Sequence, residues 1–371
     1  MKVLFVGHDA TRTGAPILFL TLLRWFKENT PFQFEILLKN GGVLEPEYAR
    51  VAWHKVMNVD TARLAFFRRF LQKRDLLAGY RKAGIGLIYN NTITNGAVLE
   101  HLAPLKCPVI THVHELENYI RSCGEENFAQ IKRYTTLFIA PSRAVQENLV
   151  TCHDIPREQI VIVPEFIFVD GFRATQIQVS KEVLRQRLGI RPEALVVGAV
   201  GTTDWRKSPD LFVQMAVVAA RRYPQHKIHF VWVGVESCWE LGYDVEKAGI
   251  HNITFVPPMP NLTDYYNCFD MLTLTSRIDP CPLVCLEAAA LGKPILCFAG
   301  AGGMPEFVED DAGFVVPYLD IDEMAAKVAE LCEQRDLCAL LGERARAKVF
   351  ERHDVAVAGS RILEIIHGVV K

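Results

Sequence analysis

The sequence predicts an α/β protein built from two doubly wound domains. Its length of 371 residues, half of them apolar, provides material for two cores. Short continuous apolar runs such as Val3–Val6 are typical of buried parallel strands, and helical patterns separate them. We expect a first domain over residues 1–170, a second over 171–354, and a helix over 355–371 that packs back toward the first domain. The active site is expected in a cleft between the domains, at the carboxyl ends of the strands.

The first domain begins with a strand, a glycine-containing loop and a helix. Further strands and helices alternate after it, with Ser142 expected to cap the last of these helices. Strands are expected at 3–6, 32–38, 86–89, 108–112, 137–140 and 160–163, and helices at 15–28, 43–50, 95–105 and 143–151.

The alternation restarts after Gly189 and Pro192, which predicts the entry to a second domain. Asp320-Ile-Asp322 superficially looks like a metal-binding Asp-x-Asp, but it precedes a helical pattern, so we expect Asp322 to be a helix N-cap. Strands are expected at 195–200, 228–233, 253–256, 271–275, 295–298 and 314–316.

Charge and cysteine content narrow the class of protein. The formal net charge is −2, which gives no sign of a nucleic-acid partner. The 10 cysteines lack the paired spacing of a zinc site, so we expect reduced thiols in a cytoplasmic protein. The apolar run after Lys2 is too short for a signal peptide, and no apolar stretch reaches the roughly 18 residues of a membrane span.

Residues 63–82 interleave basic and apolar side chains, which predicts a basic amphipathic helix. Such a helix can lie on anionic lipid, so peripheral contact with the inner face of a membrane is one interpretation. A covering helix with a solvated basic face is the other.

One carboxylate, Glu287, falls in a helix that is otherwise apolar all round. Because a buried carboxylate is costly without a partner, Glu287 needs one. Pro282 suits the first helical position, which leaves the N–H groups of Leu283 and Val284 as an anion site at the positive end of the helix. Glu287 lies one turn further on the same face. A nucleoside diphosphate with its ribose fits both features; pairing with an arginine or with backbone is the structural alternative.

Two adjacent cations, Arg206 and Lys207, follow Gly201 after the first strand of the second domain. A glycine permits close approach, an arginine can bind phosphate through two hydrogen bonds, and a lysine acts as a point charge. Ser208 is expected to cap the helix that begins at Pro209. This pattern predicts a pyrophosphate site, with an exposed charged turn as the alternative.

His114 follows the strand at 108–112, at the sheet edge where open α/β sheets bind ligands. It is a candidate site residue, and a structural histidine is the alternative. The pair of His112 and His114 lacks a third ligand in the sequence, so no metal is expected. Gly14 belongs to a second candidate ligand loop, for which an ordinary strand-to-helix turn is the alternative.

Together these residues resemble glycosyltransferase family 4, the retaining enzymes of GT-B fold also called glycosyl transferases group 1. The resemblance runs over nearly the whole chain and is strongest from Val197 to Pro317. It is carried, in chain order, by Gly14, by His114-Glu115, by Arg206-Lys207, and by the acid-x7-acid pair Asp279 and Glu287 with the following Gly302-Gly303-x-Pro305-Glu306.

The resemblance implies transfer of a hexose-type sugar from a nucleoside diphosphate sugar to a saccharide or lipid-linked acceptor, with retention and without a metal or cofactor. A role in polysaccharide or glycoconjugate synthesis follows from it. By the resemblance, Glu287 binds the ribose, Asp279 contacts the donor sugar, Arg206 and Lys207 neutralise the diphosphate, His114 lies beside the reacting sugar, Gly14 lets its loop approach the diphosphate, backbone around Val256 and Pro258 holds the base, and Gly302 and Gly303 complete the donor site.

Two alternatives stay open. The first acid of the pair is usually glutamate, whereas here it is Asp279, followed by Pro-Cys-Pro. This departure keeps open a non-catalytic protein that binds sugar nucleotides. Among enzymes, a GT-B sugar-nucleotide epimerase is the alternative.

Overall fold

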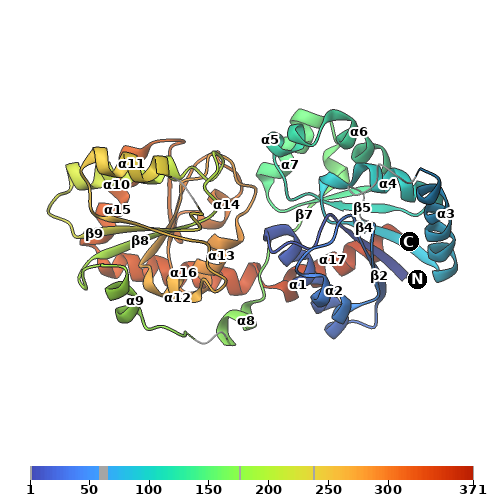
Figure 1. Ribbon diagram of the computed structural model, residues 1–371, viewed down its shortest axis with the longest axis horizontal. Helices are drawn as coiled ribbons and strands as arrows, with labels where there is room; N and C mark the ends of the chain where they lie inside the picture. The colour runs from blue at the N-terminus through green and yellow to red at the C-terminus, as the bar shows by residue number, and fades with distance from the viewer. Residues whose placement is uncertain (1, 58–65, 175–176, 237–238, 371) are drawn as a thin grey trace. The chain divides into compact units, whose positions relative to one another are not determined.

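The computed structural model describes residues 2–57, 66–174, 177–236 and 239–370. The chain divides into two compact units, Met1–Phe166 with Val355–Lys371, and Ile167–Asp354. Each unit is a parallel sheet with helices on both faces (Figure 1), which confirms the predicted doubly wound α/β class. The boundary expected after residue 170 falls inside a short helix, α8 (Val169–Ala174).

Within the described residues, the first unit has a sheet of order β3-β2-β1-β4-β5-β6-β7, with all neighbouring strands parallel. The interior strand β1 includes Val3–Val6, which are completely buried, as expected for a strand covered on both faces. The strands are β1 (Lys2–Gly7), β2 (Gln33–Leu38), β3 (His54–Val56), β4 (Ile85–Asn90), β5 (Val109–His112), β6 (Leu137–Ala140) and β7 (Ile160–Ile162).

The final helix of the chain packs on the first helix of this unit. Gly359 allows the close approach, since a Cβ there would lie 2.4 Å from the ring of Trp25. The α-helices of the unit are α1 (Gly14–Asn29), α2 (Glu45–Val51), α3 (Phe66–Ala83), α4 (Gly96–Leu102), α5 (Glu117–Ser122), α6 (Glu125–Tyr134), α7 (Arg143–His153) and α17 (Val355–Val370); three short 3-10 turns are η2 (Ile93–Asn95), η3 (Ala103–Leu105) and η4 (Arg157–Gln159).

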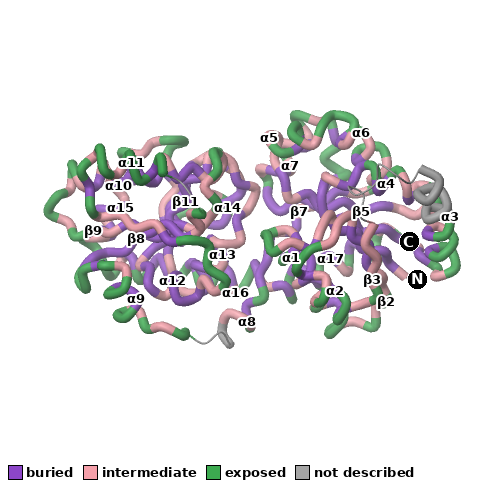
Figure 2. Tube along the Cα trace, viewed as in Figure 1, coloured by how far each residue is buried: buried purple, intermediate pink, exposed green. Residues whose placement is uncertain are grey.

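The second unit has a sheet of order β10-β9-β8-β11-β12-β13, again parallel throughout the described strands. Figure 2 shows its strands as the most buried part of the unit. Helices α10, α11 and α15 cover one face, and α9, α12, α13 and α16 cover the other (Figure 1). The strands are β8 (Leu195–Val200), β9 (Ile228–Val233), β10 (Ile253–Val256), β11 (Met271–Leu274), β12 (Ile295–Phe298) and β13 (Gly313–Val316).

The α-helices of the second unit complete its two covering layers. They are α8 (Val169–Ala174), α9 (Lys181–Arg187), α10 (Pro209–Arg222), α11 (Trp239–Ala248), α12 (Thr263–Cys268), α13 (Leu283–Ala290), α14 (Met304–Val308), α15 (Ile321–Glu333) and α16 (Arg335–Arg352).

Of the three N-caps predicted from the sequence, one is confirmed and two are wrong. Ser142 caps α7 as predicted, accepting from the N–H of Val145. Ser208 precedes α10, but its backbone is left-handed and its hydroxyl donates to the carbonyl of Trp205, so it does not cap the helix. The N-cap of α15 is Asp320 rather than Asp322, because the helix begins two residues earlier than the pattern indicated.

The basic segment predicted over 63–82 lies partly outside the described residues, which resume at Phe66 with α3. The side chains of 66–74 are likewise outside the description, so the proposed lipid contact stays a prediction. Among the helices of the described residues, none is both long and apolar enough to cross a membrane.

Each sheet reverses its strand order at one place, between β1 and β4 in the first unit and between β8 and β11 in the second. In open α/β sheets, ligands bind outside the carboxyl ends of the strands at such a switch point. The loop after β8 carries Arg206 and Lys207, and the loop after β11 carries Asp279. The fold therefore puts these predicted residues at the edge where a ligand is expected.

Candidate functional site

The two cations of the second unit converge on Asp279. Lys207 Nζ donates to Asp279 Oδ2 at 2.6 Å, and an Arg206 guanidinium nitrogen donates to the same oxygen at 3.2 Å. The hydroxyl of Ser276 also donates to it. Asp279 is only 5% exposed, so a nearly buried carboxylate fixes both cations in place. Residues separated by more than 70 positions thus form one charged cluster.

Neighbouring contacts hold the cationic loop in shape. The carbonyl of Arg206 accepts from the N–H of Arg277 at 2.9 Å, and Asp204 accepts from the N–H of Lys207 at 2.9 Å. Arg277 also binds both carboxylate oxygens of Asp210 and lies over the ring of Trp205. Arg277 was not among the predicted site residues, since nothing in its local pattern separates it from a surface arginine.

Gly302 joins the loop after β12 to the loop that carries Asp279. The N–H of Asp279 donates to the carbonyl of Ala301 at 2.7 Å, and the N–H of Gly303 donates to that of Pro280 at 2.9 Å. Gly302 has a φ of 145°, and a Cβ there would lie 1.6 Å from the carbonyl oxygen of Asp279. Only glycine fits this approach without displacing the Asp279 backbone.

Glu287 lies on α13 and has a tyrosine as its hydrogen-bond partner. Its Oε2 accepts from the hydroxyl of Tyr266, a completely buried residue of α12, at 2.7 Å. Burial raises the pKa of Glu287 above its usual value, while the hydrogen bond from Tyr266 lowers it. The sequence correctly indicated that this carboxylate needs a partner, but it did not identify Tyr266.

The amino-terminal end of α13 lies within this charged region. Burial raises the pKa of the Cys285 thiol on this helix; the charge of Lys207 lowers it, and the charges of Asp279 and Glu287 raise it. All three charged groups thus lie near enough to act on one residue of the helix. The helix begins at Leu283, with Pro282 as its N-cap rather than its first residue. Leu283 and Val284 are therefore the first two helical residues, as the anion-site prediction requires.

The segment expected to hold a nucleobase follows β10. The carbonyl of Val256 accepts from the N–H groups of Gly234 and Val235, so it is already engaged by the loop after β9. Pro258 is exposed in a run in which Met259 is flanked by prolines. Because proline has no N–H, the donor that this run offers to a base is the N–H of Met259.

His114, in the first unit, bonds a carboxylate on one side and an amide on the other. Its Nδ1 lies 2.6 Å from Glu165 Oε1, and its Nε2 lies 3.2 Å from Asn91 Oδ1. The side chains of His114 and Glu165 are 6% and 5% exposed. Burial alone lowers the pKa of His114, but the charge of Glu165 and its hydrogen bond, with the charge of Glu115, raise it above the usual value.

His112 stacks on His114, with ring centroids 4.1 Å apart. The third ligand that the sequence did not offer is supplied by the fold, since atoms of His112, His114 and Glu165 lie within 4.8 Å of one another. The Glu165 carboxylate already accepts a hydrogen bond from His114 Nδ1 at 2.6 Å, so we interpret this trio as a hydrogen-bonded ion pair beside a second ring.

Gly14 is exposed and is the first residue of α1, rather than part of a loop. It lies close to the His114 network, since the amide nitrogen of Asn91 donates to the carbonyl of Ala15 at 3.4 Å. Asn91 thus links His114 to Ala15, the residue that follows Gly14.

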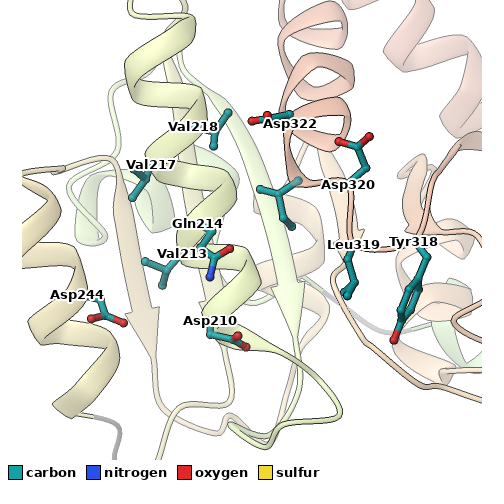
Figure 3. Close-up of a pocket in the computed structure, with 11 residues that line it drawn as sticks. Asp210, Val213, Gln214, Val217, Val218, Asp244, Tyr318, Leu319, Asp320 and Asp322 are labelled. Carbon is teal, nitrogen blue, oxygen red and sulfur yellow. The ribbon is translucent and has the colours of Figure 1, made fainter.

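A pocket of about 710 Å³ opens between α10, α11 and the start of α15 (Figure 3). Four carboxylates line it, those of Asp210, Asp244, Asp320 and Asp322, and it includes none of the predicted site residues. A lining of this charge disfavours a diphosphate. We therefore locate the candidate donor site at the Arg206, Lys207 and Glu287 cluster and not in this pocket.

Comparison with solved structures defines the class of fold. HepE from Anabaena, solved in complex with UDP and glucose, matches with a TM-score of 0.82 at 20% identity, over 99% of each chain. A glycosyltransferase from Rickettsia africae matches with a TM-score of 0.80 at 16% identity, over 100% of this chain and 98% of that one. The two doubly wound units are those of the GT-B fold, as the sequence predicted.

Residues 180–348 match the family model described as glycosyl transferases group 1. This match, over a little less than half of the chain, agrees with the resemblance seen in the sequence. D-inositol 3-phosphate glycosyltransferases from Saccharomonospora viridis and Nocardia farcinica are 26% and 27% identical over 257 and 262 residues, each match covering 66% of this chain. The matches cover 58% and 55% of those relatives' own lengths, less than two thirds in each case.

Proposed function

We propose that this protein is a retaining glycosyltransferase that takes a hexose-type sugar from a nucleoside diphosphate sugar. The observation that carries the proposal is the cluster in which Arg206 and Lys207 meet Asp279 beside the amino-terminal end of α13, with Glu287 one turn along. Each group matches one part of such a donor. The match of residues 180–348 to the glycosyl transferases group 1 model supports the same class of reaction.

The diphosphate is assigned to the cations and the helix end. In sugar transfer, negative charge develops on the departing diphosphate, and preorganised donors stabilise it most when their geometry is fixed beforehand. Asp279 provides that fixed geometry for Arg206 and Lys207. The N–H groups of Leu283 and Val284 add the positive end of α13. Protein groups thus supply the positive charge that a metal would otherwise bring, and we propose a metal-independent reaction.

The ribose is assigned to Glu287. A carboxylate has two oxygens, and one of them is anchored here by the Tyr266 hydroxyl. That anchor fixes the orientation of the carboxylate group, which can accept hydrogen bonds from neighbouring ribose hydroxyls. The base is assigned to the exposed run after Val256 that contains Pro258, whose free donor is the N–H of Met259.

Asp279 is proposed to contact the hydroxyls of the donor sugar, and His114 to lie beside the reacting carbon. Retention by front-face attack follows from the resemblance to glycosyltransferase family 4. For the acceptor we propose a saccharide or a lipid-linked acceptor, in the synthesis of a polysaccharide or glycoconjugate. The relatives from Saccharomonospora viridis and Nocardia farcinica are named D-inositol 3-phosphate glycosyltransferases. Polyol phosphates are therefore a further acceptor class to include in assays.

The test is a thermal-shift screen against nucleoside diphosphates and their sugars, followed by turnover with the sugar that stabilises most. UDP-glucose comes first, since the similarly folded HepE was solved with it. Ligand at about 100 times its Kd adds roughly 2.7 kcal/mol to the free energy of unfolding, a readily measured shift. We expect glycoside product with the anomeric configuration of the donor, by NMR, and equal rates in EDTA and in Mg²⁺.

Three results would each contradict part of this account. Epimerised sugar nucleotide formed without an acceptor would identify an epimerase. Stabilisation by a sugar nucleotide without product from any acceptor would identify a binding protein. Turnover that stops in EDTA and returns with Mg²⁺ would overturn the metal-independent chemistry.

A further inference from the structure

We propose that Glu165 is a positioning residue that holds His114 as a doubly protonated imidazolium, so that His114 serves the reaction as a fixed cationic donor. The inference rests on the proposed function for its catalytic meaning, but its structural content stands on the first unit alone. Neither the sequence pattern nor the comparisons single out Glu165, which lies 51 residues after His114 in the segment that follows β7.

The hydrogen bond to Glu165 determines the protonation of one ring nitrogen of His114, Nδ1. His114 Nδ1 and Glu165 Oε1 are 2.6 Å apart, and both side chains are almost entirely buried. A carboxylate in such a place accepts, so Nδ1 carries a proton and donates it. Excluded water makes this charge-assisted bond stronger than the same pair would be on the surface.

The hydrogen bond to Asn91 determines the protonation of the other ring nitrogen, Nε2. The amide nitrogen of Asn91 donates to the carbonyl of Ala15, which leaves its oxygen facing His114 Nε2 at 3.2 Å. That oxygen can only accept, so Nε2 also carries a proton. With acceptors on both sides, the imidazole is matched in its charged form and in neither neutral tautomer.

The surrounding titratable groups favour His114 as the charged histidine of this cluster. Burial lowers the pKa of His8, in the loop after β1; the charge of Asp9 raises it, and the charges of His114 and Lys39 lower it. Burial and then the charge of His114 lower the pKa of His112. Burial raises the pKa of Glu115, which accepts from Thr92 and from the N–H of His114 rather than from its ring. His112 also bonds the hydroxyl of Tyr89. His8 Nε2 lies 3.5 Å from Asp9 Oδ2, whereas the carboxylate beside His114 is closer, at 2.6 Å.

This arrangement gives His114 a defined role in the proposed reaction. The hydrogen bond to Glu165 keeps the proton on Nδ1. The longer hydrogen bond, from Nε2 to Asn91, is the one that a substrate oxygen can replace. The imidazolium then donates to that oxygen and brings a positive charge to it. A neutral histidine would supply the hydrogen bond without the charge, and its strength would change with pH across the neutral range.

The experiment is NMR of the full chain with ¹³C,¹⁵N-labelled histidine, with the His114 signals assigned by their loss in H114Q. In the wild type we expect both ring nitrogens of His114 to be protonated at pH 7.5. In E165Q, the amide still accepts a hydrogen bond but carries no charge, so His114 should titrate at lower pH. Turnover of the donor identified above should fall about tenfold at pH 7.5 and recover as pH is lowered.

A second pair of a glutamate and a histidine, Glu117 and His153, supplies the matched control. Glu117 Oε2 lies 2.7 Å from His153 Nε2 in the same unit. E117Q removes the carboxylate beside another histidine, so the titration of His114 and the turnover should stay unchanged. Should E165Q fail to fold, the wild-type spectrum alone still decides whether His114 is an imidazolium.

The inference is overturned if wild-type His114 is neutral at pH 7.5, or if His114 titrates at the same pH in E165Q as in the wild type. Failure of the proposed function looks different: the E165Q shift in the His114 titration would be present, but the wild-type protein would transfer no sugar from any donor.

Discussion

Replacing Lys207 with alanine lowers kcat for sugar transfer about 100-fold, because removing one preorganised donor to developing negative charge typically costs a factor of that size. Lys207 is the more enclosed of the two cations, with a side chain 13% exposed against 34% for Arg206. Its charge is therefore less screened by water than that of Arg206. We expect the R206A variant to lose less activity than K207A. Initial rates at saturating donor measure both effects.

The K207A variant should fold, since Asp279 keeps its bonds to Arg206 and Ser276. The matched control is K227A, which removes a lysine from an exposed ion pair with Glu193 in the same unit. Exposed pairs contribute about 0–1 kcal/mol to stability, so K227A should behave as wild type. An unchanged kcat in K207A, or equal losses in K207A and K227A, would show that Lys207 has no role in stabilising the leaving group.

Replacing Gly302 with alanine destabilises the second unit and weakens donor binding together. The added Cβ would lie 1.6 Å from the carbonyl oxygen of Asp279, a backbone atom that cannot rotate away, so the Asp279 loop must shift. We expect the free energy of unfolding to fall by about 1–3 kcal/mol. We also expect UDP affinity to fall at least about tenfold, because a displacement near 1 Å disrupts a preorganised site. Urea unfolding and calorimetry measure the two quantities.

Gly300 provides the control that isolates the clash. It also has a positive φ, 71°, but nothing lies within 4 Å of a Cβ placed there. The G300A variant therefore has the conformational cost of a side chain at positive φ without the collision. G302A should lose clearly more stability and UDP affinity than G300A. Equal losses in the two variants would mean that the contact between Gly302 and Asp279 does not shape the site.

The doubly wound fold was predictable because parallel strands covered on both faces are continuous apolar runs, as in Val3–Val6. The pattern fails where that coverage is thin. Strand β3 is three residues long with none of them fully buried, and helices α5 and α6 follow each other in a polar stretch. Ser208 looks like a cap in sequence, but its left-handed backbone turns the hydroxyl back onto Trp205.

The candidate site was predictable where the argument depended on one residue and its own element. An apolar helix around Glu287 implies a partner, and cations after β8 imply an anion. The identity of each partner depends on the tertiary structure. Tyr266 lies 21 positions from Glu287, and Glu165 lies 51 positions from His114, each in another segment of the chain. Both are ordinary in their local sequence, and only the fold reveals what they contact.

The central claim, that Glu287 receives the ribose of a nucleoside diphosphate, is tested most directly by calorimetry with UDP and 2′,3′-dideoxy-UDP. We compare the wild type, E287A, and Y266F, which removes the anchoring hydroxyl but keeps the carboxylate. Hydrogen bonds to a charged group contribute about 1.5–3 kcal/mol, so E287A should weaken UDP binding about 10- to 100-fold. Binding of the dideoxy analogue should be the same in E287A and wild type, with Y266F intermediate for UDP. Equal affinity of E287A and wild type for UDP would contradict the account.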